Sequence, residues 1–499
     1  MLIVVHLDRA RLFRWQLALA EALRDRGHTG VVQFRATSEP LPVSLTSLLD
    51  FDAARLRTTR DRFSALLRPA DFAKFSSAQS GIADLEIDLS TVVEPAQTSK
   101  RTLRPNFDGS PQDHALYHAL LASRAPDLTV ADSAGGVWPI GLPALETPAR
   151  LAPSLDQTAS RLVEGLVLIV ARLASAERPP QSAAPVPNAG KPQSVLSSAT
   201  KFASKRMASK LSRAGDRVTG DAPKWHVAWR KIADAELPQP GILKLSGFHI
   251  LPDDGKRFYA DPFAFVHEGK THVFVEEFPD HTQKGIISHF TISDDGVATQ
   301  PFPVLDEPHH LSYPQVFAEG GEIWMLPEAS SSGGLDLYRA EQFPDRWVKA
   351  ARILNEPVHD ATLFSHLGHC WIAASTTAHQ SSSWDSLSLF WSDKLLGPWR
   401  PHARNPVLID AKSARPAGAL WQDGESLIRA AQDCSQNYGG QITLKQITGL
   451  DPRRFDEVTL GTLSFAPESR ILGPHTLSRA GNIELIDLYA RPSILRAGS

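Results

Sequence analysis

One short pattern recurs five times in the second half of this 499-residue chain: an apolar strand, a tight turn and a second apolar strand. Its first copy, FYADPFAFVHEGKTHVFVEE, runs from Phe258 to Glu277. One residue near the start of each copy marks the repeat, and these markers lie 52, 47, 55 and 59 residues apart: Pro262, Pro314, Ala361, Pro416 and His475. A period of this length built from strand pairs is typical of a β-propeller, in which each copy is the inner hairpin of one blade.

The chain also supplies the outer strands that such blades need. In the first blade, Gly285–Thr291 and Gln300–Leu305 predict a second antiparallel pair across the turn residues DDG. The fifth copy ends at Leu488, and too little chain follows it for two more strands. We expect strands within Trp225–Ile250 to complete that blade, because an open edge leaves backbone groups unpaired. The sequence therefore predicts an all-β, five-bladed β-propeller over residues 224–499.

The first part of the chain has a different pattern. Apolar runs at Leu2–Val5 and Val31–Phe34 flank the amphipathic segment Arg11–Arg26, which predicts strand, helix and strand. A long helix is predicted over Ser154–Ser175, with Ser154 and Gln157 as a capping box. Further elements are expected at Leu85–Leu89, His114–Ser123 and Leu128–Ala131. We therefore expect residues 1–176 to form a small α/β domain.

Residues 177–223 read as a linker that is first rich in proline and then basic. The basic part, Lys201–Arg217, has the sequence KFASKRMASKLSRAGDR. It predicts either a solvated linker helix or a helix that contacts anionic lipid headgroups at a membrane surface.

Composition excludes several classes of protein. With a net charge of −3, nothing in the overall balance favours a nucleic-acid partner. The chain has only two cysteines, Cys370 and Cys434, which fits a reducing compartment rather than a disulfide framework. The N-terminal apolar run is too short for a signal peptide. We expect a cytoplasmic protein. The basic segment would also allow peripheral contact with the inner membrane.

Polar residues stand where each inner strand begins or ends, and in a propeller these positions converge on the axis. The candidate site residues are Tyr259, Asp261, Tyr313, Glu328, His359, Asp360, Arg415, Gln432 and Asp433. Buried carboxylates need either partners or a chemical function. Two interpretations follow: the aspartates cap strand ends, or the convergent set binds and transforms a ligand.

Several motifs in order resemble a known group: ADPF, HLSYPQVF, MLPE, HDATLF, GPW followed by NP, and RAAQD. They are similar to the N-terminal propeller domain of glucosamine inositolphosphorylceramide transferases and their bacterial relatives. More remotely, the pattern resembles the five-bladed glycosidases, the arabinanase, xylosidase, invertase and levansucrase types. That resemblance implies a catalytic carboxylate at Asp261 and a second at Asp360. It also implies an acid in blade four, but Arg415 stands there.

The departure at Arg415 leaves the mechanism open. Glu328, or else Asp433, is the candidate substitute acid, and Arg415 is expected to bind an anionic leaving group such as a phosphate. Tyr259 and Tyr313 are expected to stack on a sugar ring, with His359 and Gln432 as further substrate contacts. No histidine, cysteine or aspartate spacing is diagnostic of a metal site, and no cofactor is expected.

Three functions remain from the sequence. The first is a carbohydrate-active enzyme that transfers or hydrolyses a glycosyl unit on a glycan or phospho-glycolipid. The second is a non-catalytic glycan-binding module that assists a partner glycosyltransferase, and the third is a protein-interaction scaffold. The N-terminal domain faintly resembles nucleotide-type or formyltransferase-like domains. It lacks their Asn-x-His plus Asp constellation and a glycine-rich phosphate loop, so we expect a degenerate, non-catalytic domain.

Overall fold

The structure is a computed structural model. It describes residues 1–35, 40–56, 61–75, 82–91, 101–179, 199–202, 204, 221–233, 237–423 and 426–498. The chain divides into two compact units, Met1–Arg213 with Thr377–Ser382, and Ala214–Thr376 with Ser383–Ser499. Most of the basic segment Lys201–Arg217 lies outside the described residues, so its membrane contact stays a prediction. Among the described helices, none combines the length and the apolar composition needed to cross a membrane.

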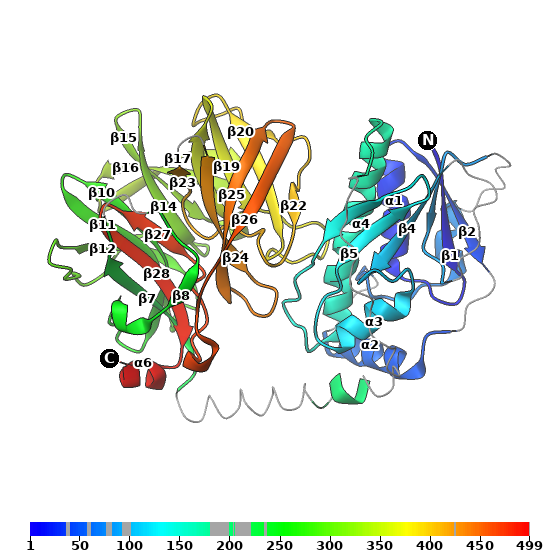
Figure 1. Cartoon of the computed structure of the whole chain (residues 1–499), viewed down its shortest axis with the longest axis horizontal. Helices are drawn as coiled ribbons and strands as arrows, with labels where there is room; N and C mark the ends of the chain where they lie inside the picture. Colours follow the sequence, from blue (N-terminus) through cyan, green and yellow to red (C-terminus); the bar gives the residue numbers. More distant parts are fainter. Residues whose placement is uncertain are drawn as a thin grey trace. The chain divides into compact units, whose positions relative to one another are not determined.

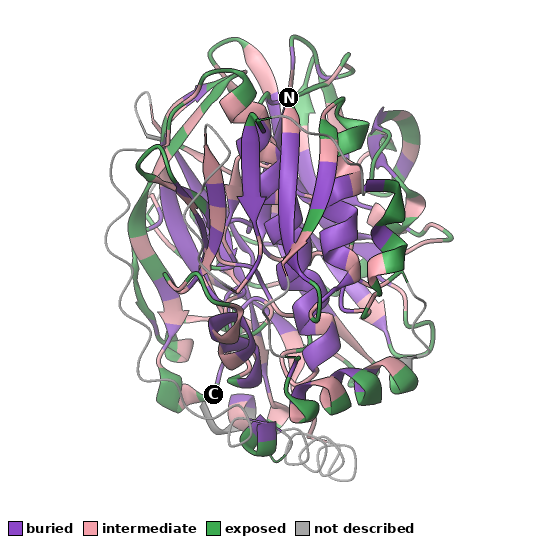
Figure 2. Ribbon diagram, turned by 90° about the vertical axis from the view of Figure 1, so that its right-hand side faces the viewer, coloured by how far each residue is buried: buried purple, intermediate pink, exposed green. Residues whose placement is uncertain are grey.

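The N-terminal unit is built on one six-stranded sheet with the order β2-β1-β3-β4-β5-β6 (Figure 1). Its strands are β1 (Leu2–Asp8), β2 (Thr29–Arg35), β3 (Leu85–Asp88), β4 (Thr102–Phe107), β5 (Leu128–Asp132) and β6 (Val137–Gly141). The neighbours from β2 to β4 run parallel, and β5 and β6 are antiparallel to their neighbours. The strands and helices at the centre of this unit are largely buried (purple in Figure 2). This mixed sheet with helices confirms the predicted α/β class.

Within residues 1–179, as far as the structure describes them, four α-helices accompany the sheet. They are α1 (Arg14–Asp25), α2 (Val43–Leu56), α3 (Asp113–Leu121) and α4 (Leu151–Ala174), with a 3₁₀ turn, η1, at Pro69–Phe75. Helix α4 packs against the other three. The predicted capping box is wrong, because α4 begins a turn earlier and has Arg150 as its N-cap. Ser154 lies inside the helix, where its hydroxyl donates to the Arg150 carbonyl at 2.7 Å.

The second unit is a set of five blades in which each inner strand is followed outward by its hairpin partner (Figure 1). Blade one contains β10 (Arg257–His267), β11 (Lys270–Pro279), β12 (Ile286–Ile292) and β13 (Phe302–Leu305). Blade two contains β14 (Ser312–Glu319), β15 (Glu322–Glu328), β16 (Leu335–Gln342) and β17 (Arg346–Leu354). Blade three contains β18 (His359–His366), β19 (His369–Ser375), β20 (Ser386–Ser392), β21 (Arg400–Pro401) and β22 (Leu408–Ile409).

Blades four and five take strands from both ends of the unit. Blade four contains β23 (Trp421–Asp423), β24 (Ser426–Asp433), β25 (Gln441–Asp451), β26 (Arg454–Phe465) and the parallel strand β8 (Gly241–Leu243). Blade five contains β27 (Leu477–Ala480), β28 (Ile483–Ala490), β7 (Lys224–Lys231) and β9 (His249–Ile250). Short helical turns lie at η2 (Leu245–Gly247), η3 (Ser330–Ser332), η4 (Pro467–Ser469) and α6 (Pro492–Gly498). The pairing of β28 with β7 confirms that upstream strands complete the last blade.

Three inner strands carry the same irregularity at their start. The ladders of blades one to three shift register at the same place, and the residues there are Asp261, Tyr313 and Asp360. Their φ angles are 50°, 47° and 49°, in the left-handed region that costs a residue with a side chain about 1 kcal/mol or more. A bulge of this kind re-aims a side chain at the end of a strand. The repeat therefore positions one side chain at an equivalent point in each of these three blades.

Candidate functional site at the propeller axis

Polar groups from blades that are not neighbours meet at the start of the inner strands. The Tyr313 hydroxyl, from blade two, accepts a hydrogen bond from the Gly418 N–H at the entry to blade four. The same hydroxyl lies 2.9 Å from the Thr362 hydroxyl in blade three. Because blades two and four are separated by a whole blade, these contacts place the starts of the inner strands at the propeller axis.

A buried cluster joins blades two, three and four around Asp360. Arg415 donates from Nε to Asp360 Oδ2 at 2.6 Å and from Nη2 to Oδ1 at 3.0 Å. Gln432 Nε2 donates to Asp360 Oδ2 at 2.7 Å. Glu328 accepts the Asp360 N–H at 3.1 Å and lies 3.9 Å from Arg415 Nη2, while its Oε1 is 3.3 Å from His359 Nδ1. The structure thus brings together five of the nine residues that the sequence singled out.

Arg415 uses its guanidinium entirely within the protein. Besides Asp360, its Nη1 donates to the Ser383 carbonyl and hydroxyl oxygens at 3.2 and 2.9 Å, and its Nη2 donates to the Tyr438 hydroxyl at 3.4 Å. A guanidinium has five N–H donors, so each of them has an acceptor. Arg415 is also only 5% exposed. These contacts argue against the expected role of Arg415 as a clamp for an anionic leaving group.

The two carboxylates of this cluster have opposite pKa shifts. Burial is the largest influence on the pKa of Asp360; Arg415 opposes it, Glu328 reinforces it, and the pKa rises to about 7. Burial would also raise the pKa of Glu328, but the hydrogen bond and charge of His359 and the charge of Arg415 outweigh it and lower that pKa. Glu328 therefore stays ionised while Asp360 titrates near neutrality. A neighbouring pair with separated pKa values is the usual basis of acid–base roles.

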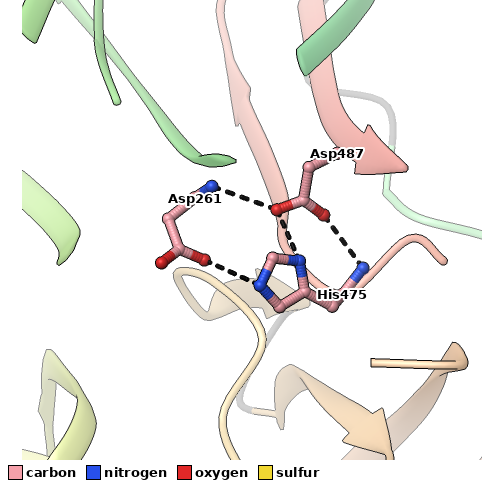
Figure 3. Close-up of side chains that lie close together, drawn as sticks. All are labelled: Asp261, His475 and Asp487. Carbon is pink, nitrogen blue, oxygen red and sulfur yellow. Dashed lines mark hydrogen bonds and ion pairs between the residues drawn. The ribbon is translucent and has the colours of Figure 1, made fainter. Parts of the chain in front are cut away.

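A second buried cluster, Asp261, His475 and Asp487, links blades one and five (Figure 3). Asp261 Oδ1 lies 3.2 Å from His475 Nε2 and accepts the Thr476 hydroxyl at 2.8 Å. Asp487 Oδ2 lies 2.5 Å from His475 Nδ1 and accepts the Asp261 N–H at 3.0 Å. The Trp225 ring stacks on the imidazole with a centroid distance of 4.0 Å. His475 and Thr476 therefore hold Asp261 at Oδ1, while its Oδ2 accepts the Tyr313 N–H at 3.2 Å.

Burial would lower the pKa of His475, but Asp487 and then Asp261 outweigh it and raise the pKa above 6.5. The two carboxylates therefore favour the imidazolium form of His475. Burial raises the pKa of Asp261, with His475 opposing and Asp487 reinforcing the shift. One oxygen or nitrogen from each residue lies within 4.8 Å of the others, so the three could also hold a cation. Such a cation would displace the protons of His475, and the absence of a metal stays a prediction.

Glu276 is a buried carboxyl group at the end of β11 that received no role from the sequence. His310 Nε2 lies 3.4 Å from its Oε1, and His310 Nδ1 accepts the Gly285 N–H at 2.9 Å, so the ring proton is on Nε2. Burial raises the pKa of Glu276 well above 4.5, and the charges of Asp261 and Glu328 raise it further. Burial and the neighbouring negative charges therefore favour the protonated form of Glu276.

A register comparison would have identified Glu276. It pairs with Ala260 directly before the bulge of blade one, and Glu328 pairs with Ser312 directly before the bulge of blade two. The two glutamates are therefore equivalent positions in successive blades. The signal in the sequence is the Glu that ends each second inner strand, in HVFVEE and in MLPE.

The two tyrosines expected to stack on a sugar do not have a free ring face. Tyr313 is fully buried, with its ring edge-on to Phe263, and Tyr259 is 4% exposed within the core between blades one and five. The half-buried aromatic surface beside Glu276 is instead formed by Phe258 and Phe278. Their rings stack at 4.9 Å and 9°, and Phe278 lies 6.1 Å from His310. These rings replace the tyrosines as candidates for contact with a sugar ring.

Asp433 does not join the axial clusters. Its Oδ1 accepts the Ser435 N–H and hydroxyl at 3.0 and 2.6 Å, and its Oδ2 accepts Gln441 Nε2 at 2.8 Å. These are the bonds of a local turn at the end of β24. They speak against Asp433 as the substitute acid.

Comparison with known proteins agrees with the motifs. Residues 252–470 match the family described as "Glucosamine inositolphosphorylceramide transferase 1, N-terminal". These residues belong to that domain family. A glucosamine inositolphosphorylceramide transferase 1 of Arabidopsis thaliana is 37% identical over 205 residues, which are 40% of this chain and 27% of the relative. The protein of that name from Oryza sativa subsp. japonica is 36% identical over 205 residues, 40% of this chain and 28% of the relative. The chain thus spans about a quarter of the length of these relatives.

Solved structures with a similar chain path are distant. The catalytic domain of the GH62 alpha-L-arabinofuranosidase of Coprinopsis cinerea is 12% identical, with a TM-score of 0.36 over 54% of this chain and 98% of that chain. A GH43_1 enzyme from Xanthomonas citri is 11% identical, with a TM-score of 0.37 over 49% of this chain and 84% of that chain. A family 117 glycoside hydrolase from Zobellia galactanivorans is 12% identical, with a TM-score of 0.34 over 54% of this chain and 90% of that chain.

Proposed function

We propose that the propeller transfers or hydrolyses a glycosyl unit at its axis, with Glu276 as the proton donor and Asp261 as the base. The observation that carries this proposal is the arrangement of charges at the axis: Glu276 is buried and faces His310, whereas Asp261 and Asp360 are paired with His475 and Arg415. Cleavage of a glycosidic bond needs one group that protonates the leaving oxygen and a second that attacks or activates the acceptor. Glu276 takes the first role in place of the acid that Arg415 replaces in blade four.

The neighbours of each group fit its role. His310 Nε2 lies 3.4 Å from Glu276 Oε1, where it would stabilise the carboxylate that remains after the proton has moved to the leaving oxygen. Asp261 has a raised pKa, which makes it a stronger base for the proton of a water or acceptor hydroxyl. His475 and Thr476 orient the Asp261 carboxylate. Asp360 and Arg415 act as positioning residues, because their contacts are with each other and with other protein groups.

The names of the relatives suggest the substrate class. They are transferases named for glucosamine and inositolphosphorylceramide, so we propose a phospho-glycolipid or the glycan of one as the ligand. Because Arg415 is occupied, the headgroup phosphate would bind outside the axial clusters. The half-buried rings of Phe258 and Phe278 would receive the sugar next to Glu276.

The experiment compares the full chain with Glu276→Gln and with Gln283→Glu, an exposed change outside the site. Each protein is incubated with vesicles that contain inositolphosphorylceramide and a nucleotide-activated glucosamine, and separately with glycosylated inositolphosphorylceramide. Mass spectrometry of the lipids detects gain or loss of a sugar. Glu276→Gln should lower turnover about 10²- to 10⁴-fold without changing the melting temperature at pH about 5. Equal turnover of Glu276→Gln and the wild-type protein would refute the assignment.

A second function is favoured by one feature, the saturation of Asp360 and Arg415 by protein partners. It is a glycan-binding module that presents its ligand to a partner glycosyltransferase. The same vesicles distinguish the two functions. Binding to glycosylated vesicles that Glu276→Gln retains, with no turnover by the wild-type protein, would support the binding module.

A further inference from the structure

A cavity lies in the N-terminal unit, at the carboxyl ends of its parallel strands. It is lined by the last residues of β1 and β3, the end of β4, the start of α1 and the first turn of α3. The empty space between its lining residues is about 560 Å³, and this figure includes space that is continuous with solvent. In the sheet, β2 lies on one side of β1 and β3 on the other. The connections from β1 to β2 and from β2 to β3 therefore lead to opposite sides of β1. Such a topological switch point opens a crevice at the carboxyl edge of the sheet.

Asp8, the last residue of β1, is the feature that points to a ligand. The residue is only 2% exposed and lines the cavity. Its Oδ2 accepts the Thr91 N–H at 2.8 Å, while its Oδ1 is buried and has no hydrogen-bond partner. Buried carboxylate oxygens are almost always satisfied, because an unpaired one loses the hydrogen bonds it made with water. A donor from a bound molecule would fill this place.

The cationic groups of the cavity are already paired with acids. Arg11 Nη1 donates to both oxygens of Asp113, at 3.0 and 2.8 Å. Asp88 accepts the Ser90 N–H and hydroxyl at 3.0 and 2.6 Å, and it is ion-paired with Arg104. The open position at Asp8 therefore calls for a hydrogen-bond donor, and the pairing of the arginines gives a phosphate little to bind.

The walls of the cavity are aromatic. Phe13 and Trp15 come from the start of α1, Phe107 from the end of β4, and Tyr117 from α3. All four are less than 9% exposed, so they shield the acceptor from bulk water. Aromatic faces pack against the C–H faces of sugar rings while a carboxylate accepts from the hydroxyl groups at the ring edge.

We infer that this cavity binds a neutral, hydroxylated ring, a sugar, with Asp8 Oδ1 accepting a ring hydroxyl. The ring could be a free hexose or the ribose of a nucleoside, which share this chemistry. The inference concerns a different domain from the axial site and does not depend on the function proposed for the propeller. It gives the N-terminal domain a binding role, although the domain lacks a glycine-rich phosphate loop.

The test is titration calorimetry of the full chain with three probes: glucose, glucosamine and adenosine. Binding of glucose alone would identify a hexose site, and binding of adenosine alone a ribose site. Tighter binding of glucosamine than of glucose would show that Asp8 prefers an ammonium group, which would overturn the neutral-ligand inference. No binding of any probe at millimolar concentration would overturn the inference as a whole.

Variants show whether binding takes place at Asp8. Asp8→Asn changes an acceptor into a donor at the same size and should weaken binding about 10- to 100-fold. Asp25→Asn, at an exposed carboxylate at the end of α1, is the matched control and should bind like the wild-type protein. Leu116→Phe enlarges a side chain that lines the cavity and should also reduce binding. Wild-type affinity in both Asp8→Asn and Leu116→Phe would place the ligand elsewhere and refute the inference.

Discussion

Replacing Arg415 by methionine tests the energetics of the axial cluster directly. Arg415 supplies two of the three side-chain hydrogen bonds that Asp360 accepts, and both residues are at least 95% buried. Removing one partner of a buried ion pair costs on the order of 3–5 kcal/mol, because the remaining charge is left buried without compensation. Since the pKa of Asp360 is about 7 with Arg415 present, protonation can relieve the cost in acid. The loss of stability should therefore be smaller at pH about 5.5 than at pH about 8.

Differential scanning calorimetry of the full chain measures this effect in the propeller transition. For a unit of this size about 2–4 °C corresponds to each kcal/mol, so the melting temperature should fall by roughly 6–20 °C at the higher pH. Arg454→Met is the matched control in the same blade, because Arg454 is 65% exposed and its pair with Asp456 should contribute at most about 1 kcal/mol.

The double variant Arg415→Met with Asp360→Asn completes the design. It removes both charges, so it should recover most of the stability that Arg415→Met alone loses. The reasoning fails if Arg415→Met is no worse than Arg454→Met. It also fails if the double variant is as unstable as Arg415→Met, because the cost would then come from lost packing and not from an uncompensated charge.

Four further outcomes are expected. Because the pKa of Glu276 is raised in the folded state, its contribution to stability is complete below about pH 4.5 and is lost as pH rises through the folded pKa. Between pH about 5 and 8.5 the melting temperature of Glu276→Gln should therefore fall less than that of the wild-type protein. Identical pH profiles of the two proteins would contradict this. His475, whose pKa is also raised, contributes fully below about pH 6.5, so His475→Gln should destabilise more at pH about 6 than at pH about 9 in urea titrations. Gly285→Ala puts a Cβ within 2.8 Å of Glu276 Oε1 and closer still to the Leu311 carbonyl oxygen. This substitution should lower the free energy of unfolding by about 1–3 kcal/mol. Gly247→Ala is the control and should be near neutral, because a Cβ there has open space around it. Deletion of Lys201–Arg217 should reduce co-sedimentation with anionic vesicles if that segment contacts lipid, and equal sedimentation would exclude the contact.

The propeller could be predicted because its period is visible in the residues. Each inner hairpin carries its own alternation of apolar residues and its own turn, so blade count and closure follow from the sequence alone. The N-terminal sheet was only partly predictable. The strand β4 contains Pro105, which argues against a central strand, and it was not expected. In the structure β4 pairs with β3 only as far as Leu103, so Pro105 interrupts no ladder on that side.

The composition of the axial site was predictable, but its partners were not. The sequence placed Asp360 and Arg415 at equivalent strand starts, yet nothing in it showed that they form a two-pronged pair with each other. The polar residues next to Tyr313 predict that its ring stacks on a sugar. Its φ of 47° turns the side chain into the axis, where the hydroxyl is used by Gly418 and Thr362. Side-chain direction at a bulge depends on a local dihedral angle, and residue type does not determine that angle.

The charges at the axis decide which acid keeps its proton. Among the described residues, five buried carboxyl groups influence one another there, and two cationic side chains are paired with them, Arg415 with Asp360 and His475 with Asp261 and Asp487. Glu328 lies 3.3 Å from His359 Nδ1 and 3.9 Å from Arg415 Nη2. Glu276 faces only the neutral His310, since burial lowers the pKa of that imidazole.

Glu276 has no cationic neighbour to offset the effect of burial, whereas His359 and Arg415 offset it for Glu328, which explains why the pKa of Glu276 rises while that of Glu328 falls. The axis then retains more negative than positive charge. A glycosyl transition state carries positive charge on the sugar ring, so this excess of negative charge would stabilise it more than the neutral substrate. Loss of the Glu276 proton to the leaving oxygen adds to that field as the positive charge develops. On the proposed function, Arg415 stands in blade four where an acid was expected. Glu276, which has no cationic neighbour among the described residues, protonates the leaving oxygen instead.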